Sequence, residues 1–144
     1  MSFITLKSSI KSKLESISEI QQVADYPTED FNGFPAAAVR TMGNTSDYET
    51  TTENDELYSF LVYLFNPLDN PVNDRIKVRS FMEELCDTVR DAFDSDEFLS
   101  GISMPSGRIM IGIRPTVSLI DESDNGKFIT AEIVLDIRVS KNIN

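Results

Sequence analysis

The chain has 144 residues, a length that fits one domain, and its 13 basic and 24 acidic residues give a net charge of −11. Histidine is absent and there is one cysteine, which excludes catalytic triads, imidazole metal sites, intrachain disulfides and cysteine zinc clusters. The acidity argues against a protein that holds nucleic acid on a basic surface. The composition favours one acidic domain, residues 1–144, that contacts other proteins, is not an enzyme and takes no cofactor.

The first expected element is an amphipathic helix over about residues 3–18. Apolar residues recur there at steps of three and four: Phe3, Leu6, Ile10, Leu14 and Ile17. Residues 20–26 then lead into Pro27 as a short strand or an extended exit. The N-terminus lacks the pattern of a secretory signal, and no apolar run reaches the roughly 18–20 residues of a membrane span. We therefore expect folding in the cytoplasm, no membrane contact, and a reduced, buried thiol at Cys86.

A hairpin is expected over residues 36–65. Its first strand contains the alanines at 36–38, which are poor strand formers and therefore imply close packing against another element. Its second strand, residues 57–65, is almost wholly apolar, which suits burial on both faces. Between the strands, the polar residues of about 43–56 predict an irregular, acidic hairpin tip.

A second helix is expected over about residues 73–94, because apolar side chains form a broad helical stripe from Ile76 to Phe93. Residues 109–119 and 129–139 alternate between apolar and polar, as half-buried strands do, and an Asn-Gly turn signal lies between them. Pro115 predicts an edge, a bend or a bulge. The predicted fold is α+β: a mostly antiparallel four-stranded sheet, made of two hairpins, with two main helices packed on one face.

The negative charge is concentrated in one part of the chain. Between Arg40 and Arg75 there are seven acidic residues and no basic one. One interpretation is a solvated loop and a polar strand edge. The other is a surface that repels an anion or meets a basic partner.

One motif match indicates a calcium loop but does not fit its surroundings. The matching residues are Asp121, Ser123, Asn125, Gly126 and Glu132. Such a loop needs a helix on each side, whereas the flanking segments alternate with a period of two. We therefore expect a plain hairpin and no metal site. Paired carboxylates elsewhere carry no sign of a shared apolar cleft, which acid–base catalysis would require.

The order of elements resembles the tail terminator and tail-completion proteins of tailed bacteriophages. The resemblance rests on Val23–Pro27, on Phe31–Val39, and on the acidic, threonine-rich Tyr48–Asn54 before a long aromatic strand, with the second helix and the closing hairpin after them. It covers nearly the whole chain. It depends on element order and diffuse similarity and not on a catalytic signature.

The resemblance implies a subunit of a closed ring, usually a hexamer, at the head-proximal end of the virion tail, assembled in the host cytoplasm. Its partners would be further copies of itself, the tail tube protein and a neck or head-completion protein, and DNA would pass through without specific binding. We predict that one group of residues faces the lumen or a neighbouring subunit: Asp47, Tyr48, Glu49, Glu53, Asp55 and Glu56. We predict that Arg108 and Arg114 meet carboxylates of a partner; the alternative is an ordinary polar strand face.

Two other functions remain open from the sequence. One is a neck or head-completion protein, that is, a head-tail connector, of similar fold. The other is a non-viral acidic adaptor domain that binds a basic partner and forms no ring.

Overall fold

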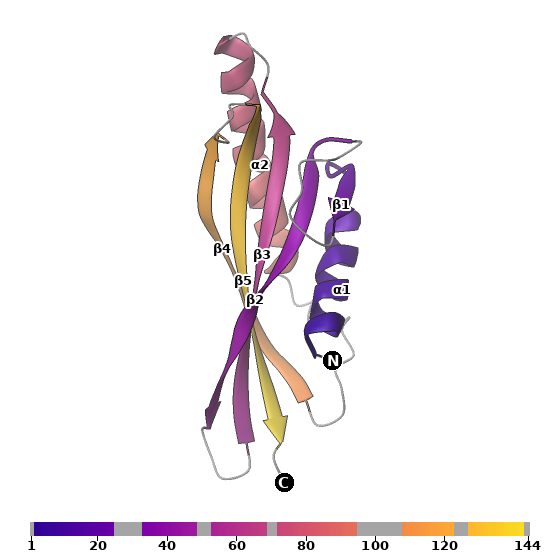
Figure 1. The fold of residues 1–144 in the computed structure, drawn as a ribbon, viewed down its shortest axis with the longest axis vertical. Coiled ribbons are helices and arrows are strands. Elements are labelled where there is room, and N and C mark those ends of the chain that lie inside the picture. The colour runs from indigo at the N-terminus through magenta and orange to yellow at the C-terminus, as the bar shows by residue number, and fades with distance from the viewer. Residues whose placement is uncertain are drawn as a thin grey trace.

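The computed structural model describes residues 2–24, 33–48, 53–68, 72–94, 108–122 and 127–142. The elements follow one another along the chain as labelled in Figure 1: α1 (Ser2–Glu15), β1 (Gln22–Ala24), β2 (Ala36–Tyr48), β3 (Glu53–Pro67), α2 (Val72–Phe93), β4 (Arg108–Glu122) and β5 (Phe128–Asn142).

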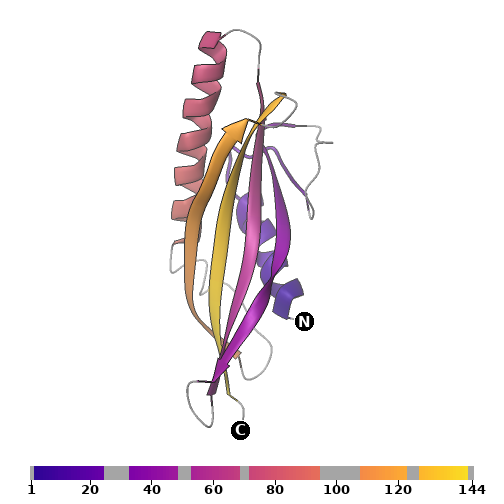
Figure 2. The same ribbon diagram turned by 60° about the vertical axis from the view of Figure 1, so that its left-hand side comes forward.

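The described strands form one sheet in the order β1-β2-β3-β5-β4. The pairs β2–β3, β3–β5 and β5–β4 are antiparallel, and β1 runs parallel to β2. The long strands twist strongly, so that the part of the sheet near the C-terminus is turned relative to the rest (Figures 1 and 2).

The predicted four-stranded, mostly antiparallel sheet is wrong, because the sheet has five strands and mixed pairing. The additional strand is β1, in which Gln22 pairs with Ala36 and Ala24 with Ala38. Three residues are too few to show a period of two. The sequence therefore predicts either a short strand or an extended exit for this segment. The α+β class stands, with two long hairpins at its centre.

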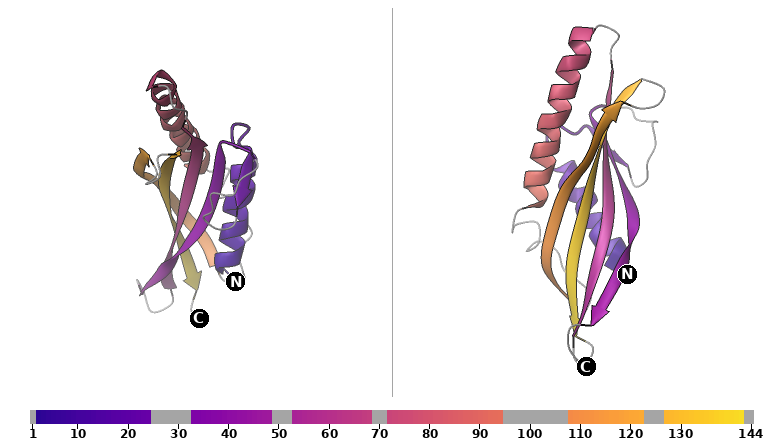
Figure 3. Two further views of the ribbon diagram at one scale, coloured as in Figure 1. Left: turned by 45° about the horizontal axis from the view of Figure 1, so that its top comes forward. Right: turned by 90° about the vertical axis from the view of Figure 1, so that its left-hand side faces the viewer.

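Both helices lie on the same face of the sheet (Figure 3), and no other helix is present in the described part of the chain, so we call the opposite side the helix-free face. The buried side chains of both helices join those of β2, β3 and β5 in one hydrophobic cluster. On α1 the predicted stripe is buried at Leu6, Ile10 and Leu14, and helix α1 ends three residues earlier than expected. On α2 the stripe is buried from Met82 to Phe93, whereas Ile76 is exposed to solvent.

Strand β3 is central and is buried on both faces over much of its length. Phe60, Val62 and Leu64 point into the helix-side cluster, while Leu61 and Phe65 are buried on the opposite face. The alanines at 36–38 are fully buried, as their composition predicted. They lie where β1 pairs with β2, and Ala37 belongs to the same hydrophobic cluster as the buried residues of α1.

The acidic segment 43–56 is more regular than the sequence predicted. Strands β2 and β3 stay paired from Ala36 opposite Phe65 to Tyr48 opposite Asn54, with one irregularity between Thr41 and Gly43. Residues 49–52 lie outside the described residues. Most of the predicted irregular tip is therefore an extended ladder of strand pairs.

Pro115 lies on β4, which is the edge strand at one end of the sheet. The prediction of an edge position is therefore confirmed. The pairing of β4 with β5 also shifts between Met110 and Gly112 and between Val117 and Leu119. Bulges and a proline are typical of an edge that resists uncontrolled strand pairing.

The thiol of Cys86 lies in the core, on α2, with 2% of its surface exposed. Its pKa is raised from 9.0 to about 11, chiefly by burial and also by the charges of Asp87 and Glu83, while Arg90 acts in the opposite direction. Since the thiolate is the reactive form, we expect Cys86 in the folded protein to react with a thiol reagent at pH 8 at least about 100-fold more slowly than in the unfolded protein. Stopped-flow measurements with and without denaturant test this, and equal rates would contradict it.

The raised pKa also makes stability depend on pH. The folded state keeps its proton up to about pH 11, while the unfolded thiol ionises near 9.0. The unfolded state therefore binds fewer protons in this window, and Cys86 lowers the free energy of unfolding as pH rises from about 9 to 11. Cys86→Ala should show a smaller fall than the wild type over the same range. Identical pH profiles of denaturant unfolding would contradict the prediction.

Candidate interaction surface

The helix-free face of the sheet carries a mixture of aromatic, aliphatic and charged side chains. The Tyr63 and Phe65 rings stack at a centroid distance of 6.1 Å, and Arg40 approaches the Tyr63 hydroxyl at 3.5 Å. Further along the same face, Leu57 is 38% exposed. A large aliphatic side chain this exposed on a strand, with no second layer over it among the described residues, marks this face as a candidate for contact with another molecule.

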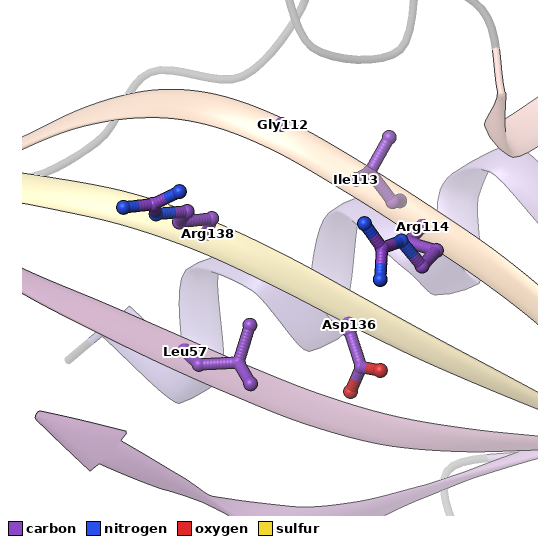
Figure 4. A pocket seen from close by; sticks show the side chains of 6 residues that line it. All are labelled: Leu57, Gly112, Ile113, Arg114, Asp136 and Arg138. Carbon is purple, nitrogen blue, oxygen red and sulfur yellow. The ribbon is translucent and has the colours of Figure 1, made fainter.

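A hollow of about 410 Å³ lies on this face, across β3, β5 and β4. We call it the arginine hollow, and six residues line it: Leu57, Gly112, Ile113, Arg114, Asp136 and Arg138. Figure 4 shows the guanidinium groups of Arg114 and Arg138 in front of the strands, with a helix behind them. Gly112 leaves room between the arginines because it has no side chain.

The register of the strands explains why these side chains meet. Leu57 on β3 pairs with Arg138 on β5, and Arg138 pairs with Gly112 on β4. The next row on the same face, two residues along, consists of Ser59, Asp136 and Arg114. Two adjacent rows therefore place two cations and one carboxylate over three neighbouring strands.

The carboxylate of Asp136 in the hollow accepts a hydrogen bond through one of its two oxygens. The Ser59 hydroxyl donates a hydrogen bond of 2.7 Å to Oδ1 of Asp136. Arg114 is exposed, and within the described residues no carboxylate comes within ion-pair distance of its guanidinium. The hollow thus presents a cation beside apolar surface, an arrangement suited to a carboxylate brought by a partner.

Of the two arginines predicted to contact a partner, the structure places only the side chain of Arg114. Arg114 lines the hollow, whereas Arg108 begins β4 opposite Lys141, and its side chain lies outside the described residues. Sequence patterns alone do not mark Leu57, Asp136 or Arg138 as site residues. A signal existed, because Asp136 and Arg138 occupy the polar phase of the alternating segment 129–139, but the pairing that brings them beside Arg114 is a property of the register.

The acidic residues predicted to face a lumen or a neighbouring subunit occupy both strands of the first hairpin. Asp47 and Tyr48 lie on β2, Glu53 and Asp55 on β3, and Glu49 is outside the described residues. Only the side chain of Glu56 is described, and it is 6% exposed. Its Oε2 accepts a hydrogen bond from the Tyr58 hydroxyl, on the helix side of the sheet. In the single chain Glu56 is therefore a core residue, and the assignment of the group stays a prediction.

The calcium-loop match lies on the second hairpin. Asp121 belongs to β4 and Glu132 to β5, and Ser123, Asn125 and Gly126 are outside the described residues. Oδ1 of Asp121 accepts the Glu122 backbone N–H at 2.8 Å. Within the described part of the chain, no group of three or more acidic or cysteine side chains is placed to hold a metal ion, and no helix is long and apolar enough to cross a membrane.

Comparison with solved structures shows a clear likeness in fold. A chain in the structure described as "Virion of native gene transfer agent (GTA) particle" superposes with a TM-score of 0.63 at 12% sequence identity. The match covers 96% of this chain and 97% of the other. No protein-family model matches the sequence, and no curated protein matches it closely enough to count as a relative.

At 12% identity the likeness concerns the backbone and not particular side chains. Its strength lies in coverage, because neither chain has more than a few residues outside the shared fold. The likeness therefore includes both helices, both hairpins and the helix-free face of the sheet.

Proposed function

We propose that the chain is a non-enzymatic structural protein of a phage-like virion, and more narrowly a tail terminator. In this role, copies of the chain form a ring, expected to be a hexamer, which caps the last row of the tail tube and joins it to the neck. The observation that carries the proposal is the likeness in fold to a chain of a gene transfer agent virion, which extends over almost the full length of both chains. The element order that resembles tail terminators supports the narrower role.

The charge distribution supports a ring through which DNA passes. The chain carries a net charge of −11, and the segment between Arg40 and Arg75 has seven acidic residues and no basic one. A lumen wall bearing such a segment repels phosphate, so that DNA slides and does not adhere. The expected partners are the tail tube protein and a neck or head-completion protein.

The test is the length of tail tubes assembled in the parent particle with and without this chain. We expect overlong tubes in its absence and normal tubes when the wild-type chain is supplied from a plasmid. Imaging of the capped tube end should show a ring of this chain at the head-proximal end.

Tubes of normal length in the absence of the chain would overturn the terminator role. If filled heads then fail to retain DNA or to join tails, the chain is a neck or head-completion protein. If particles assembled without the chain are normal in every respect, the proposal that it is a structural protein of the virion is wrong. An adaptor role would then be the explanation.

A further inference from the structure

We propose that the arginine hollow is the acceptor half of a contact between two copies of this chain. The donor half is the acidic end of the first hairpin, which we define as Ser46–Tyr48 of β2 and Glu53–Asp55 of β3. The inference rests on the proposed ring-forming function and names the surfaces through which the ring closes.

The acceptor is an exposed cation next to exposed apolar surface. Arg114 lies on the helix-free face with no carboxylate partner among the described residues, and Leu57 is 38% exposed at the other side of the hollow. The chain around Arg114 has the opposite charge character from the rest of the protein, because residues 98–120 contain two arginines and no acidic residue. A carboxylate seated here gains a charge-assisted hydrogen bond and covers the aliphatic surface.

The donor carries like charges at facing positions. Asp47 and Asp55 are direct partners in the β2–β3 register, and Glu53 lies two residues further along β3. Like charges directly opposite one another destabilise a pair of strands. By its charge, this end of the hairpin favours contact with a cation.

The two halves cannot meet within one chain. Asp55 lies in the row of Ser140, whereas Arg114 lies in the row of Ser59, four residues along β3 and two strands away. At roughly 3.3 Å per residue and 4.8 Å per strand, the backbones are separated by about 16 Å, beyond the reach of the two side chains. Arg138 lies opposite Leu57, only two residues along β3 from Asp55, so Arg114 is the cation of the hollow that the acidic end of the same chain does not reach. Contact with the acidic end must come from a second copy.

A second copy is the favoured occupant because the chain itself supplies the matching charge, in Asp47, Glu53 and Asp55 at the end of the first hairpin. Donor and acceptor are different patches of the same chain, and such heterologous contacts repeat head to tail and form a ring when the rotation between copies closes. A ring of this kind is what the proposed function requires.

The experiment measures self-association of charge-reversal variants by sedimentation velocity, over a range of concentration and salt, alone and with tail tubes present. Arg114→Glu and Asp55→Lys should each raise the dissociation constant at least about tenfold, as loss of a close charge pair does. The chain carrying both substitutions should recover association. Arg90→Glu is the matched control, because Arg90 is an exposed arginine on α2, on the other side of the sheet, and it should associate as the wild type does.

The outcomes separate this inference from the proposed function. If Arg114→Glu associates and caps tubes as the wild type does, or if the wild type forms no contact between copies on tubes, the proposed contact is wrong. If Arg114→Glu instead loses binding to duplex DNA in an anisotropy assay, the hollow is a phosphate site and the proposal is overturned. Tube length without the chain is measured separately, and normal length there overturns the terminator role while leaving the contact intact.

Discussion

Phe60→Ala is expected to lower the free energy of unfolding by about 3–5 kcal/mol, the range found when a large aromatic side chain is removed from a packed core. Phe60 is fully buried on the central strand β3, and its ring lies 6.0 Å from that of Phe3 on α1. The substitution therefore leaves a cavity between the sheet and a helix. For a domain of this size the loss is a large part of the total stability.

Denaturant unfolding followed by circular dichroism measures the effect, with Ile76→Ala as the control. Ile76 has a similar apolar side chain but is 60% exposed on α2, so its truncation should cost less than about 0.5 kcal/mol. An equal cost for the two variants would mean that the cluster around Phe60 is not the core. If Phe60→Ala is too unstable to purify, Phe60→Leu takes its place. It removes less volume, so its loss of unfolding free energy should lie between those of Phe60→Ala and Ile76→Ala.

Periodicity predicted the elements that bury one clear face. In segment 129–139 every second residue from Ile129 to Val139 is apolar and buried on the helix side, and only Val134 interrupts the polar phase. Stripes at steps of three and four predicted both helices to within a few residues, and their shared face follows from the need to cover one sheet. Such elements are readable because the burial pattern is repeated several times within one segment.

Elements defined by pairing were harder to predict. Strand β1 has three residues, and its place in the sheet depends on a parallel contact with β2. The acidic segment 43–56 lacks apolar alternation, yet it is paired because β3 continues along β5 up to Glu53 opposite Asn142. A local pattern cannot report a partner strand that lies about ninety residues away in the chain.

In the candidate site, too, a local pattern predicted single residues but not the neighbours that strand pairing gives them. Arg114 was identified as a base on a predicted strand face, but its neighbours in the hollow come from β3 and β5. Glu56 was grouped with the other acids because it lies in the base-free segment. Its phase along β3 matches that of Tyr58 and Phe60, which places it on the helix side. Charge counts describe a segment, whereas the phase of each residue decides which face it joins.

Tyr58→Phe is expected to lower the free energy of unfolding by about 1.5–3 kcal/mol, the range for losing a hydrogen bond to a charged group. The Tyr58 hydroxyl donates to Oε2 of Glu56, and both side chains are buried, at 3% and 6% exposed. The Tyr58 ring also makes an edge contact with Phe3 of α1, at a centroid distance of 4.9 Å. Phenylalanine keeps that ring contact, so the substitution removes only the hydroxyl.

Tyr63→Phe is the matched control, because Tyr63 lies on the same strand but on the helix-free face, where its hydroxyl meets Arg40 at 3.5 Å. Its loss should cost less than about 0.5 kcal/mol. A double-mutant cycle with Glu56→Gln isolates the pair, and we expect a coupling free energy of about 0.5–3 kcal/mol. Hydrogen exchange should also show faster opening at the start of α1 in Tyr58→Phe. Equal stabilities of the two tyrosine variants would show that the buried carboxylate does not depend on this hydroxyl.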